Sequence, residues 1–101
     1  MIVEERNYTL VPGGVPRYLE HWRASGRAAQ VACLGEPLGV HTVDIGQLNT
    51  LVYWWRFSDL SDRVLRRAAL AADPEFAAFR REVRSLVISQ SNRILIATPE
   101  S

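Results

Sequence analysis

The segment from Asn49 to Phe57, with the sequence NTLVYWWRF, decides the fold of this chain. It contains two adjacent tryptophans, a tyrosine and a phenylalanine, which are typical of a buried β-strand. Neighbouring side chains of a strand point to opposite faces of a sheet. One face therefore carries Leu51, Tyr53, Trp55 and Phe57, and the other carries Val52, Trp54 and Arg56. Both faces are largely apolar, but one layer of helices covers only one of them. We therefore expect a second copy of the chain to cover the other face.

The composition is that of a folded domain, with 48% hydrophobic and 23% charged residues. A chain of 101 residues suits one domain, which we assign to residues 1–101. The net charge of +1 argues against nucleic acid or an anionic membrane as the main partner. All basic residues are arginines, and they alternate with acids along the predicted helices. We interpret them as solvated faces with ion pairs.

Features that report on the cellular compartment are few. The single cysteine, Cys33, cannot form an internal disulfide, and we interpret it as a small buried hydrophobe. We find no secretory signal and no apolar run long enough to cross a membrane. We therefore predict a cytoplasmic protein.

The first half of the chain reads as a strand followed by a helix. Residues 2–11 form the strand, which ends at a Pro-Gly-Gly turn signal. From Val15 an apolar stripe with helical spacing begins, and the helix ends at Gly35. Gly26 lies inside this stripe, and we expect its missing side chain to allow a close approach to the sheet.

The second half reads as a hairpin, a broken helix and a last strand. The hairpin strands are residues 38–45 and 50–57, and the last strand is residues 87–98. The helix breaks at Asp73-Pro74, a capping aspartate followed by a proline at the first helical position. The residues that we expect its first part to direct inward are Leu60, Val64, Leu65, Ala68 and Ala72. The ion pairs that we expect on it are Asp59/Arg63 and Asp62/Arg66.

This order predicts an α+β protein with the ferredoxin-like βαββαβ fold and a split second helix. The sheet has four antiparallel strands, with strands one and three in the centre and the helices on one face. The uncovered face then favours a homodimer, a dimeric α+β barrel, and we place Trp54 and Arg56 at the seam between the two copies.

Four segments resemble the NIPSNAP family in its small single-domain bacterial form. They are MIVEERNYTLVPG, GQLNTLVYWWRFSDLSDR, RRAALAADPEFAAF and QSNRILIATP, and together they span nearly the whole chain. The resemblance implies a ferredoxin-like unit that stacks sheet against sheet in a dimer. It implies little about activity: relatives in the wider superfamily include cofactor-independent monooxygenases and isomerases, and a shared fold does not transfer an activity.

The most conspicuous chemical feature is a polar row on the first strand. Glu4, Arg6 and Tyr8 share one face at two-residue spacing. Arg6 is suited to hold a carboxylate, Tyr8 to donate a proton, and Glu4 to orient Arg6 or act as a base. The alternative is structural: Glu4 and Arg6 pair with each other, or with Arg93 or Asp44 across the sheet or seam.

Other catalytic signals are weak. His21 and His41 have no metal-spaced partner, so we predict no metal site. No glycine-rich phosphate loop and no Gly-x-Ser-x-Gly motif occurs, and we predict no cofactor. His21 remains a candidate base that looks into a cavity between sheet and helices.

Two functional hypotheses remain open. The first is a small homodimeric protein that binds an apolar or aromatic-acid ligand between sheet and helices. The second is a cofactor-independent enzyme of monooxygenase or isomerase type acting on an aromatic or polyketide-like substrate, with Glu4 or His21 as base. For both, the predicted pocket residues are Arg6, Tyr8, Tyr18, His21 and Trp22.

Overall fold

The computed structural model describes residues 1–100 and has the element order that the sequence predicts. In chain order the elements are β1 (Ile2–Leu10), α1 (Gly14–His21), a π-helical turn (Trp22–Gly26), α2 (Arg27–Leu34), β2 (Gly39–Thr42), β3 (Thr50–Phe57), α3 (Leu60–Ala72), α4 (Pro74–Val83), a 3-10 turn (Arg84–Leu86) and β4 (Val87–Ile96). The α+β ferredoxin-like fold with a split second helix is thus confirmed.

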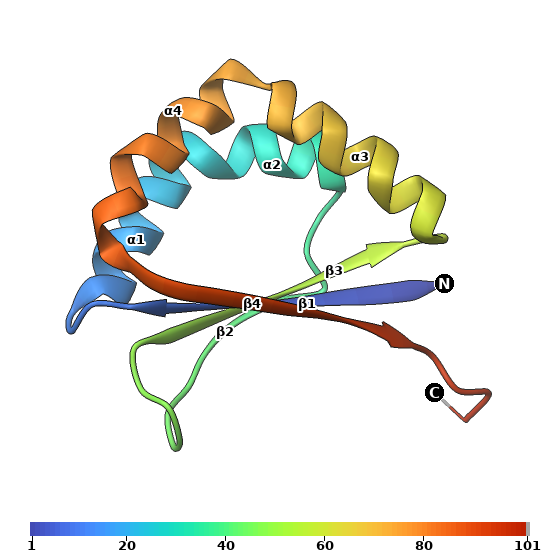
Figure 1. Ribbon diagram of the computed structural model, residues 1–101, viewed down its shortest axis with the longest axis horizontal. Helices are drawn as coiled ribbons and strands as arrows, with labels where there is room; N and C mark the ends of the chain where they lie inside the picture. Colours follow the sequence, from blue (N-terminus) through green and yellow to red (C-terminus); the bar gives the residue numbers. More distant parts are fainter. Residues whose placement is uncertain (101) are drawn as a thin grey trace.

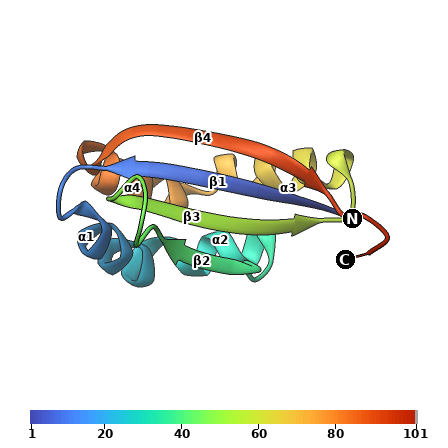
Figure 2. The same cartoon turned by 90° about the horizontal axis from the view of Figure 1, so that it is seen from below.

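The four strands form one antiparallel sheet in the order β2-β3-β1-β4. The predicted central pair is therefore correct, with Ile2 opposite Phe57 and Thr9 opposite Thr50. All helices lie over one face of the sheet (Figure 1). The view from below shows the strands uncovered on the opposite face (Figure 2). The molecule is thus a two-layer structure with one open side.

The strands are at the predicted places, but three of them are shorter than predicted. β1 ends at Leu10 instead of residue 11, and β2 begins at Gly39 instead of residue 38. β3 has the predicted bounds, but β2 ends at Thr42 instead of residue 45, and β4 ends at Ile96 instead of residue 98. The hairpin connection contains two left-handed positions, Gly46 with φ of 131° and Asn49 with φ of 58°. This backbone turns away from the extended ladder, so the chain leaves β2 early.

The core is built on the face of β3 that points toward the helices. Its members are at most 1% exposed, and they are Leu51, Tyr53, Trp55 and Phe57. Each large apolar side chain contributes about 1.5–3 kcal/mol on burial, so this one strand supplies a major share of the core. The alternation of faces that the sequence predicts is therefore correct.

Gly26 allows a close helix–helix contact, and not the contact with the sheet that we expected. It ends the π-helical turn between α1 and α2, where it faces Phe79 of α4. A β-carbon at this position would lie 2.7 Å from Cγ of the Phe79 ring. The aromatic ring fills the space that a side chain would need, which explains a glycine inside a helical segment despite its low helix propensity.

The inward face of α3 differs from the prediction. Leu60, Val64 and Leu65 are 59%, 61% and 72% exposed, and Ala68 and Ala72 are exposed as well. The helix instead directs Arg63 and Arg67 toward the sheet. The cause is the buried carboxylate of Glu4 on β1, which both arginines bind.

The helix starts of the second half are capped by aspartates. Asp59 accepts a hydrogen bond from the backbone N–H of Asp62 at 2.8 Å and thus caps α3. The expected Asp59/Arg63 pair is replaced by the bond from Arg63 to Glu4, whereas Asp62 and Arg66 pair as predicted, at 2.8 Å. Asp73 caps α4 in the same way, before Pro74. Within residues 1–100, no helix has the length and apolar character needed to span a membrane.

Replacing Gly26 by alanine is expected to destabilise the protein, although alanine is the better helix former. The added methyl group overlaps the ring of Phe79, and overpacking of this kind costs about 1–3 kcal/mol. Urea unfolding followed by tryptophan fluorescence measures the change.

The double variant Gly26→Ala/Phe79→Leu is the control, because leucine removes the ring that the methyl group meets. The two substitutions should cost less together than the sum of their separate costs. Strict additivity would contradict the proposed contact.

Candidate functional site

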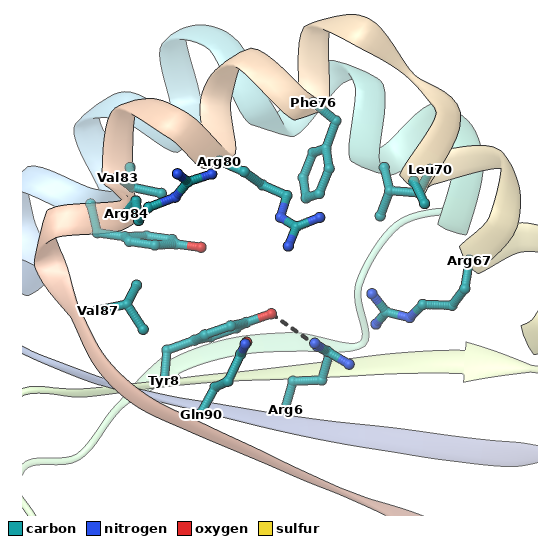
Figure 3. A pocket seen from close by; sticks show the side chains of 12 residues that line it. Arg6, Tyr8, Arg67, Leu70, Phe76, Arg80, Val83, Arg84, Val87 and Gln90 are labelled. Carbon is teal, nitrogen blue, oxygen red and sulfur yellow. Dashed lines mark hydrogen bonds between the residues drawn. The ribbon is translucent and has the colours of Figure 1, made fainter.

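A cavity of about 480 Å³ lies between the sheet and the α3–α4 layer. It is lined by residues of β1, α1, α3, α4, the 3-10 turn and β4, as the close view shows (Figure 3). The cationic and polar lining consists of Arg6, Tyr8, Tyr18, Arg67, Arg80, Arg84 and Gln90. The apolar lining consists of Leu70, Ala71, Phe76, Val83 and Val87. Cavities of this volume accept small ligands.

One wall of the cavity is supported by a buried ion cluster around Glu4. The Glu4 side chain is fully buried in the middle of β1. Its Oε2 atom accepts hydrogen bonds from Arg63 Nη2 at 2.8 Å, Asn92 Nδ2 at 2.8 Å and Arg6 Nη1 at 3.1 Å. Its Oε1 atom accepts from Arg67 Nε at 3.1 Å. The cluster therefore ties β1 to α3 and β4.

The charge state of Glu4 follows from these contacts. Burial alone raises the pKa of this carboxyl, because it disfavours the charged form. The hydrogen bonds from Arg63 and Asn92, with the charges of Arg67 and Arg6, outweigh burial and lower the pKa to about 2. Glu4 is therefore a carboxylate at neutral pH, and its lone pairs are occupied by donors.

Arg6 and Tyr8 stand side by side on the cavity side of β1 (Figure 3). Arg6 Nε donates to the Tyr8 hydroxyl oxygen at 2.9 Å. Because that oxygen accepts a bond, the Tyr8 O–H group is free to donate to a ligand. The Tyr8 ring stacks on Tyr18 with ring centroids 6.0 Å apart. This part of the wall presents a cation, a phenol and aromatic surface together.

Arg67 lines the same cavity, and both its burial and the charge of Arg6 affect its pKa. Its pKa is lowered, first by burial and then by the positive charge of Arg6, while Glu4 opposes the change. Arginine remains protonated despite such a shift. Burial and the charge of Arg6 both disfavour the charged form of Arg67, and an anionic ligand beside it would oppose both effects.

The predicted pocket residues divide into two groups. Arg6, Tyr8 and Tyr18 line the cavity, and Glu4 lies beneath them. His21 and Trp22 do not line it. The helix turns them elsewhere: His21 Nδ1 lies 3.2 Å from Glu82 Oε2 near the surface, and Trp22 Nε1 donates to Gln30.

The structure also shows which of the pairings considered for the polar row of β1 form. Glu4 and Arg6 do pair with each other, at 3.1 Å. Arg93 lies on the opposite face of the sheet, where its Nε atom is 2.9 Å from Glu5. On the same strand, Glu4 therefore has a structural role and Arg6 lines the cavity.

Trp54 and Arg56 lie on the open face of the sheet. Trp54 is 38% exposed, and its Nε1 atom donates to Glu5 Oε1 at 3.1 Å. His41 of β2 lies beside the Trp54 ring, with ring centroids 5.0 Å apart. The residues assigned to the seam thus lie outside the cavity, on the side without helices.

Sequence reasoning missed most of the cationic lining, because we interpreted the helical arginines as solvated ion pairs. Arg67, Arg80 and Arg84 belong to it. A signal was present: Arg63/Arg67 and Arg80/Arg84 are each four residues apart. Like charges at this spacing repel on a solvated helix face, so such pairs indicate a shared anionic partner. Among residues 1–100 we find no cluster of histidine, cysteine or acidic side chains suited to a metal ion.

Replacing Glu4 by glutamine should destabilise the protein strongly at pH 7. Three arginines would lose their buried counter-charge, a change that typically costs about 3–5 kcal/mol. Urea unfolding measures the loss, and Glu20→Gln at an exposed position of α1 is the control.

The pH dependence of stability tests the same cluster. The pKa of Glu4 is about 2 in the folded chain and 4.5 as its ordinary value. Its contribution, about 3 kcal/mol, is therefore complete above pH 4.5 and is lost as the pH falls toward 2. The Glu4→Gln variant should not show this pH-dependent loss of stability. An identical pH profile for both proteins would contradict the assignment.

Comparison with known proteins shows which family and which solved structures this chain is similar to. The NIPSNAP family model matches residues 3–101. Among solved structures, protein Atu4242 from Agrobacterium tumefaciens is 38% identical with a TM-score of 0.96, and the match covers 100% of this chain and 97% of that one. A NIPSNAP-like domain protein from Burkholderia xenovorans is 40% identical with a TM-score of 0.95, over 99% and 87% of the two chains.

A more distant similarity shows the fold alone. A putative antibiotic biosynthesis monooxygenase from Nitrosomonas europaea is 11% identical with a TM-score of 0.68, over 96% of this chain and 98% of that one. Curated proteins give no match. The family model, the identities near 40% and the nearly complete coverage agree, and this chain belongs to the NIPSNAP family.

Proposed function

We propose that this chain binds a small acidic molecule with an apolar or aromatic body in the cavity between the sheet and the α3–α4 layer. The observation that carries the proposal is the lining: guanidinium groups and aromatic rings converge there, and no acidic side chain is among the lining residues, all of which the structure describes. The acid would bind at Arg6 and Tyr8, and its body would rest on Phe76 and Leu70.

Physical chemistry favours such a ligand over a purely apolar one. A purely apolar body would displace water from the guanidinium groups without offering them acceptors, at a cost in affinity. A carboxylate forms short, charge-assisted hydrogen bonds with arginine, which are about twice as strong as neutral ones. The aromatic surface of Tyr8, Tyr18 and Phe76 then adds apolar contact.

The hypothesis of a cofactor-independent enzyme has less support. Such chemistry needs a general base within reach of the substrate. Glu4 is buried beneath the cavity with its lone pairs occupied, and its pKa of about 2 makes it a weak base. His21 lies outside the lining. Binding therefore explains the geometry with fewer assumptions.

The aromatic acid 1-naphthoate is a suitable probe, with uncharged 1-naphthamide as its counterpart. We expect 1-naphthoate to bind at least about 10-fold more tightly, because only the acid satisfies the arginines. Ala71→Trp should weaken its binding by about 10-fold or more, since Ala71 lines the cavity and a large ring would fill the space. Isothermal titration calorimetry measures both differences.

Ala69→Trp is the matched control, because Ala69 is also exposed on α3 but does not line the cavity. It should leave the affinity unchanged. Equal affinities for the acid and the amide, or no binding of 1-naphthoate up to about 5 mM, would sink the proposal.

We also propose that the protein forms a homodimer through the open face of its sheet. The open face of the sheet carries Trp54 and Leu95, which are 38% and 37% exposed, beside half-buried Val3 and Val52. Exposed apolar surface of this kind marks interaction sites. Two such sheets pack face to face at about 10 Å, and this arrangement would produce the dimeric barrel. A cytoplasmic location stays a prediction from the sequence.

Trp54→Glu tests the seam. Two buried carboxylates would face each other near the dimer axis, so we expect the mass from light scattering to fall from twice 11.4 kDa to 11.4 kDa. Leu65→Glu is the control, since Leu65 is exposed on α3, on the other side of the molecule. A wild-type mass of 11.4 kDa, or a Trp54→Glu dimer of unchanged affinity, would refute the seam.

A further inference from the structure

We infer that the ligand of this cavity carries two negative charges, as an aromatic dicarboxylate or an aryl phosphate does. The inference rests on the proposed binding function and specifies the class of ligand. It depends on two groups of arginines that reach the cavity from different elements: Glu4 neutralises the first only in part, and no acidic residue among residues 1–100 pairs with the second.

The first group is the cluster at β1 and α3. Three guanidinium groups, those of Arg6, Arg63 and Arg67, share the single carboxylate of Glu4. The cluster therefore keeps a charge of +2. Arg6 and Arg67 line the cavity and use part of their N–H groups on Glu4 and Tyr8. Within residues 1–100, Arg6 Nη2 has no protein acceptor and is available to an anion.

The second group lies on the opposite wall. Arg80 and Arg84 are four residues apart, at the end of α4 and in the following 3-10 turn, and both line the cavity. Figure 3 shows the Arg80 guanidinium group extending from α4 into the cavity toward Tyr8 and Arg6. The described part of the chain pairs neither Arg80 nor Arg84 with an acid. Both residues are exposed, and what distinguishes them from another unpaired arginine in this part, Arg81 of α4, is that they line the cavity.

Tyr18 lines the cavity together with Arg6 and Arg80. Burial raises the pKa of its phenol, and the positive charges of Arg6 and Arg80 both act against this rise. Arg6 stands on β1 and Arg80 on α4, so both charges are felt at one ring of the lining. A ligand beside Tyr18 is therefore within the field of both groups.

The two groups together leave four positive charges, two at the Glu4 cluster and two on Arg80 and Arg84. A ligand with one negative charge for each wall therefore fits better than a ligand with one charge in all. A single carboxylate matches the +2 cluster only in part and leaves Arg80 and Arg84 without a counter-charge. The arginines of the first group are partly buried, whereas those of the second are exposed, and each added charge-assisted contact with a ligand increases its affinity. Inorganic phosphate alone would supply two charges but leave Phe76 and Leu70 without contact. An aromatic body with two charges uses both features of the lining.

The experiment compares three naphthalene probes by calorimetry at about 0.15 M ionic strength, where screening is constant. They are 1-naphthoate, naphthalene-1,4-dicarboxylate and 1-naphthyl phosphate. We expect at least one dianion to bind about 10-fold or more tightly than 1-naphthoate. The dianion with the larger advantage distinguishes a dicarboxylate from a phosphate ester.

Arg80→Gln and Arg84→Gln should reduce this advantage to about 3-fold or less, because each removes one charge from the second wall. Arg81→Gln is the matched control: Arg81 is exposed on the same helix and does not line the cavity. It should keep the full advantage.

The outcomes separate the two proposals. If 1-naphthoate binds as tightly as both dianions and Ala71→Trp still weakens it, the dianion inference is overturned and the binding function stands. An equal loss of the dianion advantage in Arg80→Gln and Arg81→Gln also overturns it, since the effect would then be general charge attraction. If none of the three probes binds, both proposals fail.

Discussion

The buried carboxylate of Glu4 is the constraint on which the rest of this structure depends. It lies in a central strand with no exposed surface, and four hydrogen-bond donors from three elements surround it. They belong to Arg6, Arg63, Arg67 and Asn92. A buried charge without partners costs several kcal/mol, so the fold has to bring cations to this point. The cluster consequently fixes the position of α3 over β1 and of β4 beside it.

The orientation of α3 shows that ion contacts with Glu4 outweigh the burial of apolar side chains. Burying Leu60, Val64 and Leu65 would contribute about 1.5–3 kcal/mol for each side chain. Turning the helix that way would remove Arg63 and Arg67 from Glu4, and breaking buried ion contacts costs about 3–5 kcal/mol before any lost hydrogen bonds are counted. The arginine face therefore points inward. The leucine face is left exposed, at up to 72% of the Leu65 side chain.

The orientation of α3 also determines which side chains line the cavity. With Arg67 turned inward, β1 and α3 supply one cationic wall, and Arg80 and Arg84 supply the opposite one. Aromatic and aliphatic side chains fill the surface between them. This lining is the basis for our proposal of an acidic ligand with an apolar body. The open face of the sheet, with Trp54, remains separate from that cavity and is suited to a second copy.

The sequence by itself determined the element order, the two faces of β3, the central strand pair and the cap at Asp73. These follow from local alternation, helical spacing and turn chemistry, which act over a few residues. It also indicated Arg6 and Tyr8 as chemistry-bearing neighbours on one strand. Only the tertiary structure decided the rotation of α3 and the convergence of the helical arginines. Their partner, Glu4, lies 59 and 63 residues away from Arg63 and Arg67, and α3 has two faces that are both plausible from spacing alone. The three-dimensional position of one buried charge selects between them.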